Sequence, residues 1–165
     1  MTEHRAGGIT IRPYHAEQHA ERVKAIVGEI WQGGDDALME QKYGIIGGRP
    51  WGDWMAGSVL PYLDGEGARS FVAERDGEIV GFCSYVIDEG RSRGTVGYNG
   101  VARDHQGQGI GSMMLDFVME RIRAEGMQYA AVIVADNEAH AAARRNYEKH
   151  GFETIMGMHY MVRKL

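Results

Sequence analysis

The part of this chain best suited to chemistry is a glycine-rich loop between an apolar stretch ending at Val101 and a segment with helical periodicity. Its residues are Gln106, Gly107, Gln108, Gly109, Ile110 and Gly111. The first turn of a helix leaves backbone N–H groups without intrahelical partners, and the helix dipole adds roughly half a positive charge there. Glycines let an anion approach these donors and allow a positive φ. The loop therefore predicts a pyrophosphate site.

Other glycine loops also bind phosphates, and their context separates them. A P-loop ends in Gly-Lys-Ser or Gly-Lys-Thr, which this loop lacks. A dinucleotide-binding loop needs an acidic residue about 20 residues further on, and Asp136 lies farther away than that. A glycine-rich turn that only packs a helix on a strand is the remaining alternative. The hexapeptide alone does not decide among them.

A second motif, Tyr-Glu-Lys-His-Gly-Phe at residues 147–152, ends the helix–strand–helix pattern that follows the loop. Together the two motifs resemble the GNAT family of acyl-CoA-dependent N-acetyltransferases. The family's glutamine/arginine-x-x-glycine-x-glycine signature matches Gln106, Gly109 and Gly111, and its Tyr-Glu-Lys-x-Gly-Phe ending matches residues 147–152. Two separated motifs in the expected order are more specific than either alone.

The resemblance implies the fold and the cofactor. We expect an α/β (α+β) single domain over residues 1–165, with a mixed, mostly antiparallel sheet flanked by helices. Residues 9–64 are expected on the acceptor side, and residues 68–165 in the acyl-CoA-binding core. Acetyl-CoA is the implied cofactor, its pyrophosphate held by the glycine loop, and the acceptor amine attacks directly in a ternary complex. A backbone N–H near Val101 is the implied oxyanion donor.

Acetyl transfer from a thioester to an amine makes three chemical demands. The amine, with a pKa of about 10.4, must lose a proton to a base or in a desolvating pocket. The oxyanion needs a fixed donor. The departing thiolate needs a proton, which a tyrosine with a pKa near 10 can donate. By its motif position Tyr147 is the implied general acid, or else it positions the cofactor; a core tyrosine is the structural alternative.

The chain departs from the family pattern before this tyrosine. Many relatives carry an asparagine seven residues earlier, touching the pantetheine arm; His140 stands there instead, and Asn137 comes three residues sooner. Seven residues are nearly two helical turns, so His140 and Tyr147 should share one face, about 10 Å apart. We expect His140 to replace the asparagine contact or to relay a proton, and Asn137 to be among the cofactor-binding residues. A histidine at the helix entrance is the alternative.

The general base has several candidates. Residues 93–101 contain no acid and offer Tyr98 and Asn99 instead. A water chain is one option, and the acidic candidates are Glu29, Asp35, Asp36 and Glu40.

Aromatic and acidic residues interleave in the N-terminal half, which suits a cationic amine through cation–π and charge contacts. We expect a small-molecule amine, such as an amino-sugar, a polyamine or an amine-bearing antibiotic. A protein N-terminus or lysine is the rival substrate, and ordinary helix packing is the structural alternative. The expected substrate-binding residues are Trp31, Asp35, Tyr43, Trp54 and Asn99.

Composition limits the partners. The net charge of −5 argues against nucleic-acid and anionic-membrane binding, and no long apolar run is present. The chain has one cysteine, Cys83, which suggests a reducing, cytoplasmic protein without an internal disulfide. No metal is expected, and a homodimer is left open. An acyl-CoA-binding sensor or scaffold without activity, and a nucleotide-binding module, are the rival functions.

Periodicity outlines the elements, and the Asp76-Gly77 pair predicts the turn of a hairpin between two strands. Helices are expected over residues 15–31, 35–43, 51–62, 110–125 and 139–150. Strands are expected over residues 9–12, 70–74, 79–87, 95–101, 129–135 and 153–162.

Overall fold

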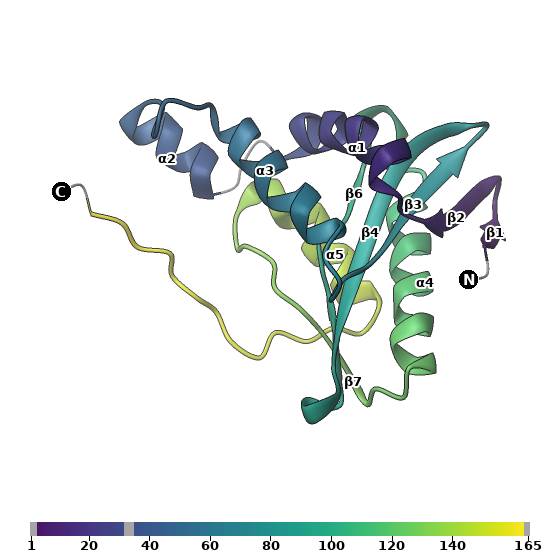
Figure 1. Cartoon of the computed structure of the whole chain (residues 1–165). Helices are drawn as coiled ribbons and strands as arrows, with labels where there is room; N and C mark the ends of the chain where they lie inside the picture. Colours follow the sequence, from purple (N-terminus) through teal and green to yellow (C-terminus); the bar gives the residue numbers. More distant parts are fainter. Residues whose placement is uncertain (1–2, 32–34, 164–165) are drawn as a thin grey trace.

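The computed structural model describes residues 3–31 and 35–163, excluding the side chains of Asp35, Asp36 and Trp51. One seven-stranded sheet runs in the order β1-β2-β3-β4-β5-β7, with β6 paired to β4 (Figure 1). Its pairs are antiparallel except β5 with β7, which is parallel. The strands are β1 (His4–Ala6), β2 (Ile9–Pro13), β3 (Arg69–Arg75), β4 (Glu78–Asp88), β5 (Arg93–Val96), β6 (Gly100–Val101) and β7 (Tyr129–Val132).

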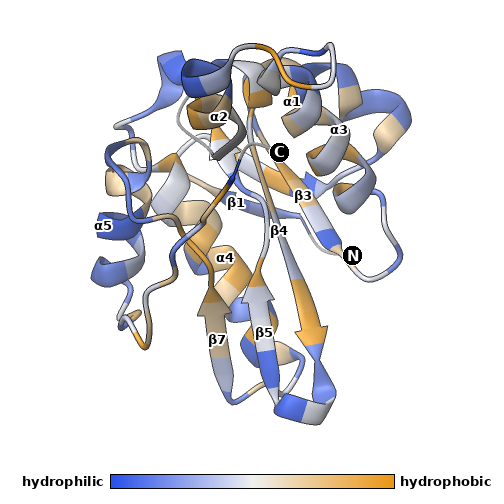
Figure 2. Ribbon diagram, turned by 90° about the vertical axis from the view of Figure 1, so that its left-hand side faces the viewer, coloured by the Kyte–Doolittle hydropathy of each residue, from blue (hydrophilic) through white to orange (hydrophobic). Residues whose placement is uncertain are grey.

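Helices cover both faces of the sheet. The α-helices are α1 (Ala16–Ile30), α2 (Asp35–Tyr43), α3 (Trp51–Leu63), α4 (Ile110–Ala124) and α5 (Ala141–Lys149). Single 3₁₀ turns are η1 (Glu89–Arg91), η2 (Arg103–His105) and η3 (Glu138–His140). Along β4, Phe82 packs in the core under α1 and α3, while Cys83 and Tyr85 pack in the core under α4. The outward turns of α1 and α5 are hydrophilic (Figure 2). Successive side chains of a strand point to opposite faces, so β4 is apolar on both.

The expected strand over residues 95–101 is divided in two, and this corrects the sequence interpretation. β5 ends at Val96 and β6 begins at Gly100, with both strands paired to β4. A Cβ atom at Gly97 would come within 2.4 Å of the Tyr62 hydroxyl, and one at Gly100 within 2.2 Å of Ile30. Helices α1 and α3 thus lie close to the backbone on either side of the break, and strand periodicity does not reveal this packing.

The parallel pair β5–β7 is short, and this shapes the site. Its register ends at Val96 opposite Val132, so β7 stops before the end of the expected strand 129–135. Beyond this point residues 97–99 and 133–135 line a common cavity. The two segments therefore separate beyond the end of β5.

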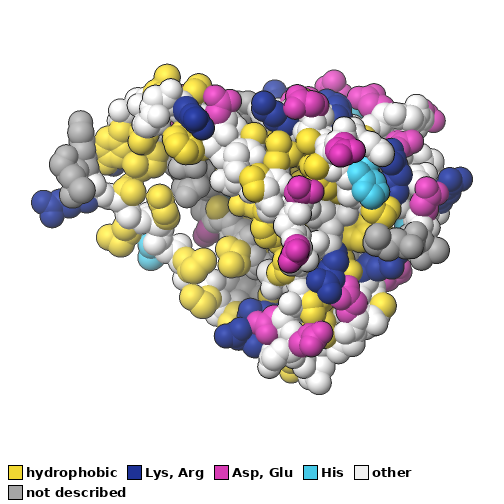
Figure 3. All heavy atoms as spheres, in the orientation of Figure 1, with side chains coloured by type: hydrophobic (Ala, Val, Ile, Leu, Met, Phe, Trp, Pro, Cys, Tyr) yellow, Lys and Arg dark blue, Asp and Glu magenta, His cyan; other side chains and the backbone are white. Residues whose placement is uncertain are grey.

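The expected final strand over residues 153–162 is wrong. These residues carry no strand, and the chain runs away from the sheet after α5 (Figure 1). Side chains such as Ile155, Met158 and Tyr160 are 89%, 67% and 68% exposed, and apolar groups line this segment in the space-filling view (Figure 3). Alternating apolar residues favour a strand, but a strand forms only against a partner. In the described part of the chain, β7 pairs with β5 alone.

Candidate active site

The N-terminus of α4 presents unpaired backbone donors. Gly109 caps the helix with a φ of 80°, a conformation that favours glycine, and no side chain caps this end. The first helical hydrogen bond runs from the Met113 N–H to the Gly109 carbonyl, 3.0 Å away. The N–H groups of Ile110, Gly111 and Ser112 therefore precede the helix's own hydrogen bonds. Added Cβ atoms at Gly107 and Gly109 would meet open space, so these donors are accessible to an anion.

The two glutamines of the loop shape it from within. The Gln106 amide donates to the Val101 carbonyl at 3.0 Å, and the Gln108 amide donates to the Asp104 carbonyl at 3.1 Å. The Arg75 guanidinium donates to the Gln108 side-chain oxygen. These glutamines hold the loop's conformation, which leaves anion contact to the backbone.

A cavity of about 890 Å³ opens at this helix end. Its walls come from the glycine loop, residues 95–101, the chain beyond β7, η3 and α5. Four cationic or titratable nitrogen-bearing side chains line it, and its described lining includes no aspartate or glutamate. These side chains are His105, His140, Arg145 and Lys149. In a chain of net charge −5, this wall is suited to an anionic ligand.

Val101 directs its backbone polar groups away from β4. The Ala102 N–H donates to the Val80 carbonyl at 2.8 Å, and Gly100 pairs with Phe82. In an antiparallel ladder, the residue between two hydrogen-bonded pairs points its N–H and C=O away from the partner strand. The Val101 carbonyl accepts from Gln106, and its N–H faces the same side, where Val101 lines the cavity.

Tyr147 lies on α5, is 7% exposed as a residue, and has its ring edge-on to Phe152. Its hydroxyl accepts a hydrogen bond from the Asn99 side-chain nitrogen at 3.0 Å, and both residues line the cavity. Burial raises the pKa of Tyr147, and the hydrogen bond from Asn99 opposes that rise. The phenol is therefore protonated at neutral pH, as a proton donor must be.

His140 and Asn137 contact each other at the entrance to α5. The Asn137 side-chain oxygen accepts from the His140 N–H at 3.1 Å and lies 2.7 Å from His140 Nδ1. Because that oxygen is the acceptor for the backbone, we assign the imidazole proton to Nδ1. His140 and Tyr147 both line the cavity, whereas Asn137 caps the turn η3 and is not among the lining residues. His140 occupies the N-cap position of α5, but its side chain makes no capping hydrogen bond there.

Only some of the expected substrate-binding residues line the cavity. Trp31 and Asn99 line the cavity, but Tyr43 and Trp54 are not among its lining. Tyr43 lies under Lys42, and the Arg49 guanidinium lies over Trp54 at 5.5 Å. The side chain of Asp35 is outside the described part.

Two lining aromatics were absent from the expected substrate-binding set. Tyr62 and Tyr98 line the cavity beside Trp31, with edge-to-face ring contacts at 5.1 Å for Tyr62–Tyr98 and 5.7 Å for Trp31–Tyr98. The sequence does indicate Tyr98, because it lies in the expected strand before the glycine loop. Tyr62 carries no sequence signal, because its position beside Tyr98 depends on how α3 packs.

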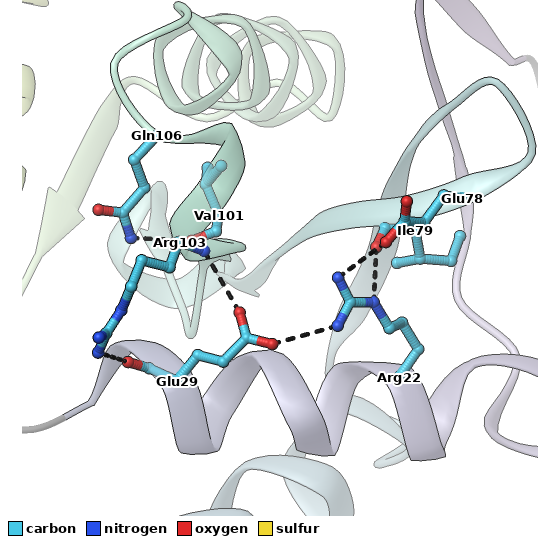
Figure 4. A network of polar contacts seen from close by, with 7 residues as sticks. All are labelled: Arg22, Glu29, Glu78, Ile79, Val101, Arg103 and Gln106. Carbon is cyan, nitrogen blue, oxygen red and sulfur yellow. Dashed lines mark hydrogen bonds and ion pairs between the residues drawn. The ribbon is translucent and has the colours of Figure 1, made fainter.

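Glu29, a candidate base, joins a polar network instead of the cavity lining (Figure 4). Its carboxylate accepts from the Arg103 N–H at 3.3 Å and from Arg22 at 3.2 Å. The Arg103 guanidinium donates to the Glu29 carbonyl at 2.6 Å. Glu40, another candidate, lies on α2 outside the lining. Asp36, like Asp35, lies outside the described side chains.

Within residues 3–31 and 35–163, no three His, Cys, Asp or Glu side chains gather as a metal ion would require. No helix in that part of the chain has the length and apolarity needed to cross a membrane.

Comparison with protein families identifies the fold and the family. The model of the Acetyltransferase (GNAT) family matches residues 31–152. The chain belongs to the GNAT acetyltransferase family. Members of this family are the acyl-CoA-dependent acetyltransferases that the two sequence motifs resemble, so the expected family and fold are confirmed.

Curated GNAT relatives match only part of this chain. The mycothiol acetyltransferase of Streptomyces griseus is 38% identical over 95 residues, which cover 57% of this chain and 29% of that protein. The chain thus spans less than a third of the length of such curated relatives.

Solved GNAT structures share the fold at low identity. The ribosomal-protein-S18-alanine N-acetyltransferase from Escherichia coli has a TM-score of 0.63 and 19% identity, covering 90% of this chain and 79% of that one. AAC(6')-Iy, solved with the bisubstrate analogue CoA-S-monomethyl-acetylneamine, has a TM-score of 0.62 and 17% identity, covering 95% and 99%.

Proposed function

We propose that this GNAT protein transfers an acetyl group from acetyl-CoA to the primary amine of a small molecule, in a ternary complex. The observation that carries this proposal is one cavity shared by the uncapped α4 N-terminus and the Tyr147 hydroxyl. The N–H groups of Ile110, Gly111 and Ser112 would hold the pyrophosphate. Arg145 and Lys149 would add positive charge where coenzyme A carries its phosphates.

The geometry supports three catalytic roles. The Val101 N–H would stabilise the tetrahedral oxyanion, a donor worth about 3 kcal/mol in other acyl-transfer sites. Tyr147 would donate a proton to the thiolate, and His140 would contact the pantetheine arm or relay the amine's proton. Direct attack is favoured because the only cysteine, Cys83, is buried, and burial raises its pKa to about 12. That thiol is not available to carry the acetyl group covalently.

The acceptor would enter beside Trp31, Tyr62 and Tyr98, from the side supplied by residues 9–64. Aromatic faces suit an amine attached to a flat or apolar group. The described cavity lining offers no carboxylate to hold an ammonium ion, so desolvation would favour the neutral, nucleophilic amine. A protein N-terminus or lysine is the rival acceptor. A single reduced cysteine matches the proposed cytoplasmic location.

Calorimetry with two matched glycine variants tests the cofactor site. Gly109 and Gly126 flank opposite ends of α4, with φ of 80° and 81°, and a Cβ at either would meet open space. Gly109→Asp places a carboxylate at the phosphate donors, whereas Gly126→Asp adds the same charge and backbone strain at the far end. We expect acetyl-CoA binding by the wild type and Gly126→Asp, with a loss of at least tenfold in Gly109→Asp. Equal affinities in the two variants would refute the loop as the pyrophosphate site.

Thiol release separates the enzyme from an acyl-CoA sensor. Acetyl-CoA is incubated with the protein and a panel containing aromatic amines, amino-sugars, polyamines and a peptide with a free N-terminus. Amine-dependent release of free thiol is the expected result. Binding without release from any amine would instead favour the non-catalytic function.

A further inference from the structure

A β-bulge separates β5 from β6 at the edge of the cavity. On β4, Cys83 and Ser84 lie between the paired residues Phe82 and Tyr85. The opposing chain has three residues over the same interval, 97–99 between Val96 and Gly100. One extra residue in a ladder bends the strand and turns a side chain in a new direction. Here the bulge contains Asn99.

Ser84 fixes the bulge to β4. Its carbonyl accepts from the Gly97 N–H at 2.9 Å, and its hydroxyl donates to the Tyr98 carbonyl at 2.8 Å. Ser84 is fully buried, so both bonds are shielded from water. The bulge is therefore a fixed platform for the Asn99 side chain.

The orientation of the Asn99 amide follows from its two partners. Its nitrogen lies 3.0 Å from the Gly97 carbonyl and 3.0 Å from the Tyr147 hydroxyl. A carbonyl only accepts, so the group facing Gly97 must be the amide nitrogen. The second N–H of the same nitrogen is then directed at the Tyr147 oxygen. Tyr147 is thus the acceptor, and its own proton points elsewhere.

The proton of the Tyr147 hydroxyl can point into the cavity, because Tyr147 is one of its lining residues. Tyr147 lines the same wall as Val101 and the glycine loop. Among the residues that the structure describes, Asn99 is the hydrogen-bond partner of this hydroxyl. Had the amide been a carboxylate, the phenol proton would have been directed at it and away from a ligand.

We propose that Asn99 is a positioning residue that makes the Tyr147 hydroxyl an acceptor toward the protein and thereby directs its proton into the cavity. This inference rests on the proposed acetyl transfer. The amine nitrogen forms a bond to the acetyl carbon, the carbon–sulfur bond breaks, and its electron pair goes to sulfur. Tyr147 gives its proton to that sulfur, and the amide N–H of Asn99 stabilises the resulting phenolate. The phenolate is reprotonated by the proton that the attacking nitrogen loses, through solvent.

Titration of Tyr147 in the free protein tests this arrangement without any turnover. Tyrosine labelled with ¹³C at Cζ reports each phenol by NMR, and Tyr147→Phe identifies the signal. Asn99→Leu removes the donor with little change of size, and Asn99→Asp keeps the shape but replaces the donor with an acceptor. We expect the ionisation midpoint of Tyr147 to move to higher pH in both variants. A midpoint that stays at the wild-type value in both would overturn the inference, whatever the enzyme's rate.

Kinetics then show whether Asn99 acts through Tyr147. With an amine substrate in hand, Asn99→Leu is expected to lower kcat about tenfold and to leave the KM for acetyl-CoA within about twofold. Placed in a Tyr147→Phe background, the same change should have almost no further effect, because the proton it directs is gone. A full tenfold loss in that background would show that Asn99 only shapes the bulge. Absence of turnover in the wild type would count against the proposed function, and the NMR midpoint would still decide the role of Asn99.

Discussion

At the scale of single residues, Tyr147 combines burial with one hydrogen-bond donor. Its ring is enclosed beside Phe152, and its hydroxyl receives the Asn99 amide at the cavity wall. Burial raises the pKa of Tyr147, so the phenol is protonated at neutral pH. The residue is thus suited to donate a proton at that pH.

We expect Tyr147→Phe to lower kcat by about 100-fold or more, the range for loss of a general acid. Activity that requires the protonated phenol is retained below its pKa and lost above it. Because that pKa is raised above 10, the wild type should lose this contribution only at strongly alkaline pH, and the variant should lack that alkaline limb. A pH–rate profile measures it, with Tyr160→Phe on the exposed C-terminal segment as control. An unchanged kcat in Tyr147→Phe would limit this residue to positioning the cofactor.

At the scale of elements, α1 is tied to the turn that precedes the glycine loop. Glu29 on α1 binds both the backbone and the side chain of Arg103 in η2, and Arg22 joins Glu29 to Glu78 and Ile79 at the start of β4 (Figure 4). The turn η2 leads directly into Gln106. Helix α1 therefore holds in place the turn that leads into the glycine loop.

Glu29→Gln should raise the KM for acetyl-CoA about two- to fivefold and leave kcat unchanged, since partly exposed ion pairs contribute roughly 0.5–1 kcal/mol. Glu21→Gln removes the same charge from an exposed position on α1 and serves as the control. Steady-state kinetics with varied acetyl-CoA separates the two parameters. A fall in kcat at constant KM would instead identify Glu29 as the general base.

At the scale of the whole molecule, the sheet ends at β7, a strand with a partner on one side only in the described part of the chain. In the part of the chain that the structure describes, β7 pairs with β5 alone, and the segment after Phe152 lies apart from it with its apolar side chains exposed. Exposed apolar segments and free strand edges both favour association with another chain. We propose that a homodimer, left open by the sequence, would form through this segment.

We expect a chain truncated after Phe152 to fold with a nearly unchanged Tm, because residues 153–163 carry almost no buried side chains. The intact chain should self-associate with rising concentration, whereas the truncated chain should not. Light scattering coupled to size-exclusion chromatography and thermal unfolding measure both properties. Met156→Lys combined with Met158→Lys offers a full-length comparison, since both side chains are exposed. A truncated chain that no longer folds would mean that the segment packs on the sheet.

The sequence by itself determined the helices, most strands, the family and the position of the glycine loop, because each depends on local signals. Helical periodicity located α1 and α4, and the Asp76-Gly77 turn located the β3–β4 hairpin. The glycine loop could be found because its glycines meet a local requirement of the backbone. Tyr147 could be found by its position in the motif at residues 147–152.

Only the tertiary structure decided how distant segments meet. It divided the strand before the loop into β5 and β6, left residues 153–163 unpaired, and removed Tyr43 and Trp54 from the cavity. It also brought Tyr62 to Tyr98 and Asn99 to Tyr147, contacts between residues far apart in the chain. Their physical origin is packing. A bulge, a sheet edge or a cavity wall depends on which helix packs against which strand. The spacing of residues within one segment does not encode that packing.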